Sequence, residues 1–464
     1  MNRKIPALIF SLFIFSSSFS QQEKENKKDF DTTSLLYAFR KGKTEGHFRF
    51  YYMTTNNDGP LTDYYAFAFG GGLKYQTRSY KGFQLGVGGF YSWNLASSDL
   101  TKPDAITNVM NRYEIGQFDQ TDPSNKKNLQ RLEDFYIRYN FKKSFLKFGK
   151  QVIKTPFINP QDGRMRPTGV QGVWTEINEF KKIKAEAGWL THISPRGTVK
   201  WYRGASSIGI YPSGVNINGS GSNYKNNLDS KGTAIAGITF SPKSNIHIQL
   251  WDNWVENIFN TILLQADADV SVAENKKIMA GIQYLHQSAL NDGGNRDISK
   301  TYFHPSQKVN IYGVRIGYNN KKTTIKLNYS HITSQGRFLF PREWGREPLY
   351  TFLPRERNEG LGDVDALTIN IGKSFLAGKL NADFSAGYYS LPDVKNYSLN
   401  KYGFPSYAQF NFDLRYSFDG FLKGLNAELL YLYKRNNGNT YNDWKYNINK
   451  TNMHQLNIIF NYIF

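Results

Sequence analysis

Closely spaced guanidinium and carboxylate groups occur in two polar stretches of this 464-residue sequence. Both stretches also contain proline and aromatic residues. A row of guanidinium forks can pass an anionic group from one arginine to the next through bidentate hydrogen bonds. Carboxylates facing those arginines would create a transverse field that favours dipolar or zwitterionic solutes. The candidate residues are Asp162, Arg164 and Arg166 in the first stretch, and Arg342, Glu343, Arg346, Glu347, Arg355 and Arg357 in the second.

A simpler interpretation of these arginines is structural. Each one would pair with an acidic neighbour and only hold its loop in place. The spacing of the residues leaves both interpretations open.

His286 and Ser288 lie two residues apart on an apolar segment, so they would share one face of a strand. This spacing resembles the His-x-Ser element of outer-membrane phospholipases. Ala289 and Leu290 stand where that family has Asn-Gly, so we predict no catalytic residue and keep an enzyme only as an alternative. Residues 291–297 are rich in carboxylates and amides but lack the spacing of a calcium loop. We expect neither a metal nor a cofactor.

The segments around these stretches show the two-residue period of β-strands. Phe135, Ile137 and Tyr139 alternate with Asp134 and Arg138, for example. Such a strand has one apolar and one polar face, as in a membrane barrel with lipid outside and water inside. Four basic residues on polar strand faces are predicted to face the lumen, either solvated by pore water or touching the solute: Arg138, Arg315, Lys326 and Arg415.

The last twelve residues, 453–464, carry the same pattern. Leu456, Ile458, Phe460, Tyr462 and Phe464 occupy every second position. An aromatic-rich strand that ends in phenylalanine is typical of the closing strand of an outer-membrane β-barrel, where the barrel-assembly machinery would recognise it. The alternative is an edge strand of a soluble sheet.

The N-terminus has the pattern of an export signal. Arg3 and Lys4 precede an apolar core at residues 5–15 and a serine-rich end, so we expect a signal peptide at 1–20 and a charged, mobile lead-in at 21–45. The absence of cysteine excludes a lipid-anchored N-terminus and disulfides. No stretch after the signal approaches 18 apolar residues, so a membrane-spanning chain of this sequence must be a closed barrel.

Composition supports the same class. Mean hydropathy is −0.55, yet the chain holds 31 Tyr and 34 Phe. In a membrane barrel, such residues form aromatic girdles at the two membrane interfaces. The net charge of +20 becomes +18 without Arg3 and Lys4. The basic residues are scattered, which argues against nucleic acid and favours a basic lumen or contact with the headgroups of outer-membrane lipid and lipopolysaccharide.

The strand pattern continues from residue 46 to residue 464. It predicts about 18 strands, because single-chain bacterial barrels use even numbers, with one over-counted segment near 171–178 or 205–211. Residues 141–144 and 319–322 are predicted tight turns. The predicted long outer loops, some folding inward, are 95–130, 153–172, 212–231, 287–306, 334–362 and 435–451.

Two of these loops resemble the OprD family of substrate-specific outer-membrane channels. Residues 149–173 resemble its third-loop region through Gly149-Lys150-Gln151, Asn159-Pro160 and Arg164-Met165-Arg166-Pro167-Thr168. Residues 340–374 resemble its seventh-loop region through Arg342-Glu343-Trp344. The resemblance implies an all-β, 18-stranded antiparallel transmembrane barrel, as a monomer or loose trimer, whose loops three and seven form a narrow constriction.

Passive, selective diffusion of small carboxylate-bearing or zwitterionic solutes across the bacterial outer membrane is therefore the leading expectation. A phospholipase-type enzyme and a sealed surface-binding or adhesion barrel are the alternatives. Passive transport through such a channel would need no nucleotide and no other cofactor.

Overall fold

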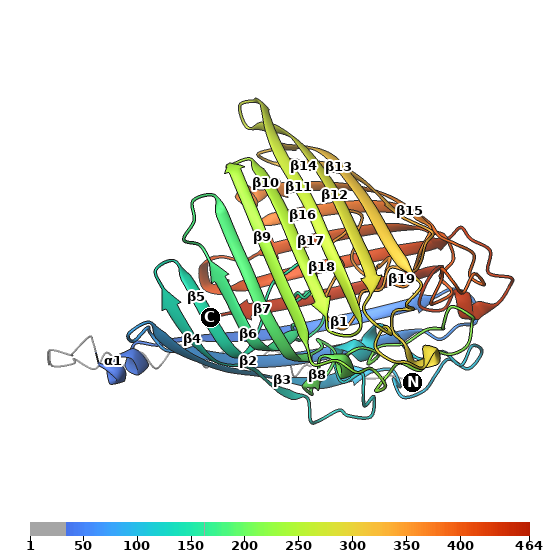
Figure 1. Ribbon diagram of the computed structural model, residues 1–464, viewed down its shortest axis with the longest axis horizontal. Helices are drawn as coiled ribbons and strands as arrows, with labels where there is room; N and C mark the ends of the chain where they lie inside the picture. Colours follow the sequence, from blue (N-terminus) through green and yellow to red (C-terminus); the bar gives the residue numbers. More distant parts are fainter. Residues whose placement is uncertain (1–33, 162) are drawn as a thin grey trace, which may run out of the picture.

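Eighteen strands form one closed antiparallel barrel in the computed structural model, which describes residues 34–161 and 163–464 (Figure 1). Closure is made by β1, which pairs with both β2 and β19. The first half of the wall is β1 (Lys43–Asn57), β2 (Tyr64–Gln76), β3 (Phe83–Ser97), β4 (Gln130–Phe141), β5 (Ser144–Gln151), β6 (Gly169–Ile177), β7 (Ile183–Ser194), β9 (Thr233–Lys243) and β10 (Ile246–Val255). The second half is β11 (Phe259–Ala273), β12 (Lys276–Ala289), β13 (Lys308–Asn320), β14 (Thr323–Ile332), β15 (Val364–Phe375), β16 (Leu380–Ser390), β17 (Tyr407–Ser417), β18 (Leu425–Asn436) and β19 (Met453–Ile463).

The predicted barrel of 18 strands is confirmed. The short β8 (Tyr202–Arg203) pairs only with β7 and stands outside the wall, which β7 and β9 continue. Of the two segments suspected of being over-counted, 171–178 is the true strand β6, whereas 205–211 is a loop with a short 3-10 helix. The over-count arose because Ile208 and Ile210 stand two residues apart in a segment that forms no strand.

In residues 34–161 and 163–464, helical structure is confined to short pieces. They are α1 (Leu35–Arg40) and the 3-10 helices η1 (Glu114–Gln117), η2 (Ala205–Ser207), η3 (Ile298–Lys300), η4 (Leu376–Gly378), η5 (Gly420–Leu422) and η6 (Trp444–Tyr446). No helix in the described part of the chain is long and apolar enough to cross a membrane. The barrel begins at Lys43, earlier than the expected boundary at residue 46, and α1 lies within the expected lead-in. The expected signal peptide and residues 21–33 lie outside the described residues.

The alternation seen in the sequence sorts side chains between the two faces of the wall. On β4, Phe135 is 62% exposed and Ile137 is 42% exposed, whereas Tyr136 between them is 6% exposed. The exposed apolar side chains face outward, where lipid surrounds a barrel of this kind. The polar residues of the same strands therefore line the interior.

Short turns and the C-terminus lie at one end of the barrel, and long loops lie at the other (Figure 1). Both predicted tight turns are confirmed, since only residues 142–143 and 321–322 lie between their strands. Counting the connections at the long end, those used below are loop 2 (98–129), loop 3 (152–168), loop 4 (195–232), loop 6 (290–307), loop 7 (333–363), loop 8 (391–406) and loop 9 (437–452). Loop 8 is not among the predicted long loops.

The buried core lies inside the mouth of the barrel. Trp344 and Phe338 of loop 7 and Phe157 of loop 3 are almost completely buried, together with Phe259 of β11 and Ile193 of β7. Loops that fold inward therefore pack against the wall with an apolar core of their own. This packing positions the polar groups described next.

Candidate functional site

Asn159 makes several of the hydrogen bonds that join loop 3 to loop 7. The Asn159 side chain donates from Nδ2 to the carbonyl oxygen of Arg346 (2.9 Å) and accepts at Oδ1 from the Arg346 backbone N–H (3.0 Å). The Asn159 backbone N–H donates to the carbonyl oxygen of Trp344 (3.0 Å). Gly345 has φ +150, and a Cβ there would lie 2.5 Å from Asn159 Oδ1. The two loops therefore approach closely enough to act as one unit.

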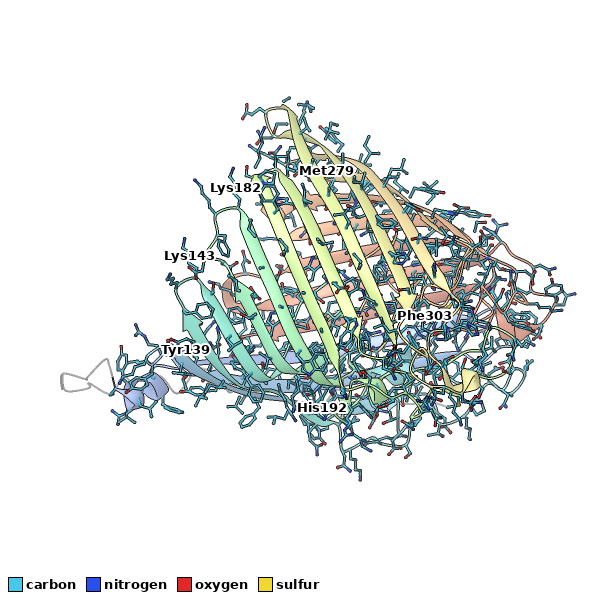
Figure 2. The ribbon with its side chains drawn as sticks, viewed as in Figure 1. Tyr139, Lys143, Lys182, His192, Met279 and Phe303 are labelled. Atoms are coloured by element: carbon cyan, nitrogen blue, oxygen red, sulfur yellow. The ribbon has the colours of Figure 1, made fainter. Side chains whose placement is uncertain are left out.

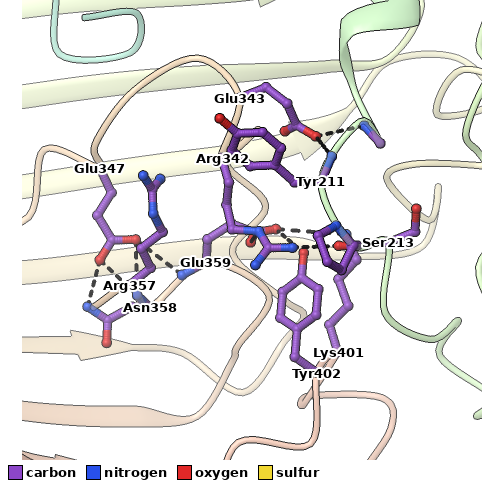
Figure 3. Close-up of polar contacts among 12 residues, drawn as sticks. Tyr211, Ser213, Arg342, Glu343, Glu347, Arg357, Asn358, Glu359, Lys401 and Tyr402 are labelled. Carbon is purple, nitrogen blue, oxygen red and sulfur yellow. Dashed lines mark hydrogen bonds and ion pairs between the residues drawn. The ribbon is translucent and has the colours of Figure 1, made fainter. Parts of the chain in front are cut away.

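Loop 7 is also fastened to loop 4. The indole Nε1 of Trp344 donates to Ser207 Oγ (2.8 Å). One carboxylate oxygen of Glu343 accepts from the backbone N–H groups of Gly209 (3.0 Å) and Tyr211 (2.8 Å) (Figure 3). Neither group is left free to bind a solute.

Loop 7 then crosses the interior of the barrel. Tyr350 O–H donates to Asp267 Oδ1 of β11 (2.8 Å). Tyr389 O–H of β16 donates to a loop-7 carbonyl oxygen (2.7 Å). Arg355 donates to Asn457 Oδ1 of β19 (2.8 Å). Contacts with strands this far apart in the barrel place loop 7 across the lumen.

Six arginines converge on a cavity of about 50 Å³ in this region. Loops 2, 3 and 4 contribute one arginine each, and loop 7 contributes three. The lining consists of Arg112, Arg164, Arg196, Arg342, Arg355 and Arg357, with Tyr113, Tyr211, Gln120, Gln161, Pro212 and Glu356. Among the described residues of the lining, one carboxylate accompanies six guanidinium groups, so this part of the lining is strongly cationic.

Most hydrogen bonds that orient these arginines go to neutral acceptors, so they do not neutralise the guanidinium charge. Arg355 donates to the carbonyl oxygen of Gly163 (3.1 Å), and Arg357 donates to Gln161 Oε1 (2.7 Å). Arg196 donates to the carbonyl oxygen of Arg342 (3.2 Å). Neutral acceptors of this kind fix the direction of a guanidinium without cancelling its charge.

Carboxylates near the cavity are already engaged. Glu356 forms an ion pair with Lys434, and both side chains are buried. Glu359 lies 3.4 Å from the Nε of Arg342, and the two face each other in Figure 3. Burial and the nearby guanidinium of Arg355 lower the pKa of Arg164 to about 9, which leaves Arg164 charged at neutral pH. The described residues around the cavity therefore carry a net positive charge.

A model of the outer membrane porins of the OprD family matches residues 75–343, more than half of the chain. The chain belongs to the OprD family of outer-membrane porins. Its strand architecture, with inward-folded loops three and seven, agrees with this assignment. A comparison with curated protein sequences finds no significant match.

Solved structures of porins share the fold of this OprD-family porin. OccK9 (OpdG) of Pseudomonas aeruginosa superposes with a TM-score of 0.71 at 13% identity, covering 92% of this chain and 99% of that one. OccAB3 of Acinetobacter baumannii gives a TM-score of 0.71 at 15% identity, with the same coverage of 92% and 99%. OpdK of Pseudomonas aeruginosa, solved with vanillate, gives 0.68 at 14% identity, also covering 92% and 99%.

Of the nine residues predicted to form the constriction, the porin brings four together at the cavity: Arg164, Arg342, Arg355 and Arg357. Arg346 is exposed and stands apart from the lining. Asp162 lies outside the described residues.

The other three predicted residues hold the loops, but through backbone groups and not through the arginine–carboxylate pairs of the structural interpretation. Arg166 is 2% exposed and donates to the carbonyl oxygens of Leu129 (2.8 Å) and Phe118 (3.1 Å) in loop 2. Glu347 accepts from the backbone N–H and the side-chain amide of Asn358, and Glu343 binds loop 4. Two of the three carboxylates expected to create a transverse field, Glu343 and Glu347, therefore point at backbone N–H groups of the loops, and the third, Asp162, is the one outside the described residues.

The four strand residues predicted to face the lumen all lie opposite the apolar outer face. Arg138 stacks over the ring of Phe145 (3.9 Å), and Arg315 stacks over the ring of Tyr350 in loop 7 (4.0 Å). Lys326 and Arg415 line a wider cavity of about 750 Å³ bordered by the short turn 321–322. Arg415 is paired there with Asp383.

Some lining residues of the porin had no signal in the sequence. Arg112 belongs to loop 2 and Arg196 to loop 4, and neither lies in a block that resembles the family. Arg196 follows Pro195 directly after β7, which marks a loop start but no function. These residues join the site only through the folding of four separate loops.

His286 and Ser288 do share the outward face of β12, as the two-residue period requires. The Nδ1 atom of His286 lies 2.8 Å from Asn310 Oδ1 of β13, so an amide occupies this ring nitrogen. Within the described residues no hydrogen bond joins the Ser288 hydroxyl to the His286 ring, so the nucleophile–base contact of a phospholipase-type site is not formed in this structure.

Proposed function

We propose that this porin passes small anionic solutes, above all those bearing carboxylates, across the outer membrane by passive diffusion. The observation that carries the proposal is the convergence of six arginines from four loops on one narrow cavity. Guanidinium groups bind carboxylates bidentately and remain charged at any physiological pH. A solute can pass between neighbouring arginines without binding tightly to any one of them. Conduction requires such weak, successive binding.

The charge balance favours anions over zwitterions. Glu356 is the single carboxylate among the described lining residues. Its ion pair with Lys434 largely cancels the attraction that it would exert on the ammonium group of a zwitterionic solute. OpdK, which shares the fold, was solved with vanillate, and vanillate is itself a carboxylate. This agreement supports a carboxylate as the solute without naming which one.

Reversal potentials in planar bilayers under a salt gradient test the proposal. Replacing Arg164 by Gln removes one cavity charge. A unit charge about 4 Å from an anion contributes about 1 kcal/mol even in bulk water, so the anion-to-cation permeability ratio should fall about fivefold. Arg203→Gln, an exposed loop-4 change outside the cavity, is the matched control and should leave the ratio unchanged.

Arg166→Gln separates the lining role from the loop-holding role. It should loosen the packing of loops 2 and 3 while changing ion selectivity less than Arg164→Gln does. An unchanged reversal potential in Arg164→Gln would contradict the assignment of the cavity as the selectivity filter. Current block by a dicarboxylate but not by a neutral sugar of similar size would identify the solute class.

Export and assembly are part of the same proposal. Residues 1–20 are removed as a signal peptide, and the barrel-assembly machinery recognises β19, the strand that closes the barrel on β1. Lipopolysaccharide surrounds the end with the long loops, and the porin acts as a monomer or loose trimer. Amino-terminal sequencing of the membrane-inserted protein should give Gln21 as the first residue.

A further inference from the structure

Exposed lysines mark every short turn of the barrel. The two-residue turns after β4 and β13 are Lys142-Lys143 and Lys321-Lys322. Lys81, Lys379 and Lys423 lie in the turns after β2, β15 and β17. All of these side chains are exposed.

The remaining three short turns follow the same rule. Lys181 and Lys182 lie between β6 and β7, Lys243 ends β9, and Lys276-Lys277 begin β12 directly after a turn. Figure 2 labels Lys143 and Lys182 at the tips of two of these turns. Since all eight turns lie at one end of a closed barrel, these exposed lysines form a ring, which we call the lysine collar.

Acidic residues at this end are too few to neutralise the lysine collar. Glu179, Glu274 and Asp419 are the exposed carboxylates of the short turns in the described chain, and Asp419 pairs with Lys379. Loops 2 and 6 at the other end are different, because there the exposed acidic residues equal the exposed lysines and arginines in number: Asp99, Asp122, Asp292 and Asp297 against Lys102, Lys126, Lys127 and Arg296. Asp99 lies 3.4 Å from Lys102, and other pairs of the same kind occur in loop 6.

Exposed apolar side chains stand beside the lysines. Phe180, 64% exposed, directly precedes Lys181, and Phe421, 94% exposed, lies two residues before Lys423. A lysine with its stem against apolar groups and its ammonium in a polar layer is suited to the boundary between hydrocarbon and headgroups. The lysine collar therefore continues the lipid-facing surface of the wall.

We propose that the lysine collar binds the phosphate groups of anionic phospholipids in the periplasmic leaflet of the outer membrane. Short turns of outer-membrane barrels face the periplasm, which places the collar at that leaflet. Clustered lysines attract anionic lipid surfaces, and the attraction falls with salt. This binding would hold the barrel at a defined depth, and it is independent of the solute that the channel carries.

Electron spin resonance of the full-length protein in phosphatidylcholine bilayers tests the proposal. The fraction of spin-labelled lipid immobilised by the barrel is compared for phosphatidylglycerol and phosphatidylcholine. The wild-type protein should prefer phosphatidylglycerol at least about twofold at low salt, and less in high salt. Absence of this preference would overturn the proposal.

Two four-lysine variants separate the collar from net charge. The collar variant changes Lys143, Lys181, Lys276 and Lys423 to Gln; these residues are exposed and none has a positive φ. The loop variant changes Lys126, Lys127, Lys225 and Lys231, which are exposed in loops 2 and 4, in the same way. The collar variant should lose the lipid preference and the loop variant should keep it, with both barrels resisting SDS without heating.

An equal loss in both variants would overturn the proposal, because net charge alone would then explain the preference. So would retention of the preference in the collar variant. Binding to isolated peptidoglycan that disappears in the collar variant, with the lipid preference unchanged, would assign the collar to the cell wall instead of to lipid.

Discussion

The hydrogen bonds between loops 3 and 7 should determine how often loop 7 leaves its position in the lumen and the constriction widens. Asn159→Ala removes both side-chain hydrogen bonds to the backbone of Arg346, of 2.9 and 3.0 Å. Each such bond contributes about 1 kcal/mol net, and the unpaired backbone groups left behind add to the loss. A total of about 2–3 kcal/mol corresponds to a population of displaced loop about 30-fold or more above its wild-type level.

Single-channel recording measures this population directly. The variant should show frequent excursions to larger conductance, because loop 7 fills the lumen when it is seated. The strand ladder is untouched, so the barrel should remain folded and resist SDS without heating. Asn227→Ala is the matched control, since its side chain bonds only to carbonyl oxygens of its own loop 4.

Recordings of Asn159→Ala that match those of the wild type and of Asn227→Ala would refute the reasoning. They would mean that the remaining contacts of loop 7, such as the bond between Trp344 and Ser207, hold the loop without the asparagine. A stable change to a new conductance level, without excursions, would instead indicate that loops 3 and 7 had repacked.

Further predictions concern pH and backbone geometry. Burial raises the pKa of Glu347 from 4.5 to about 7, although the amides of Asn358 and the guanidinium of Arg357 lower it. Between pH 4.5 and 7, loop 7 in its seated position therefore binds more protons than a displaced loop 7 does. The excursions to larger conductance should become more frequent as pH rises through this window and should level off above it. Glu347→Gln should remove this pH dependence in single-channel traces. Gly149→Ala should lower the temperature at which the barrel unfolds in SDS, because Gly149 has φ +122 and a Cβ there would lie 2.2 Å from the carbonyl oxygen of Phe135, whereas Gly221→Ala, with nothing within 4 Å, should not.

The wall of the barrel was predictable because its pattern is local. Alternation along β4, β13 and β17 assigns each side chain to lipid or lumen within a few residues of sequence. The same rule placed Arg138, Arg315, Lys326 and Arg415 on the inner face. Where the pattern was too short to require pairing, at 205–211, it misled.

Loop residues obey no such period, and their roles were not predictable one by one. Arg164 and Arg166 are two residues apart and chemically identical, yet Arg164 lines the cavity and Arg166 binds carbonyl oxygens of loop 2. Glu343 and Glu347 looked like the acidic side of a constriction, and they bind backbone N–H groups instead. Family resemblance identified the right loops without separating these roles.

By itself, the sequence of this porin determined the number of strands, the side of the wall that faces lipid and, through the family resemblance, two of the loops that fold into the barrel. These features follow from the two-residue period of strands and from short motifs. Only the tertiary structure decided which arginines meet at the cavity, because Arg112, Arg196 and Arg355 are distant in sequence and come together only through bonds between loops. Those bonds depend on how each loop seats inside the closed barrel, and no local spacing encodes that.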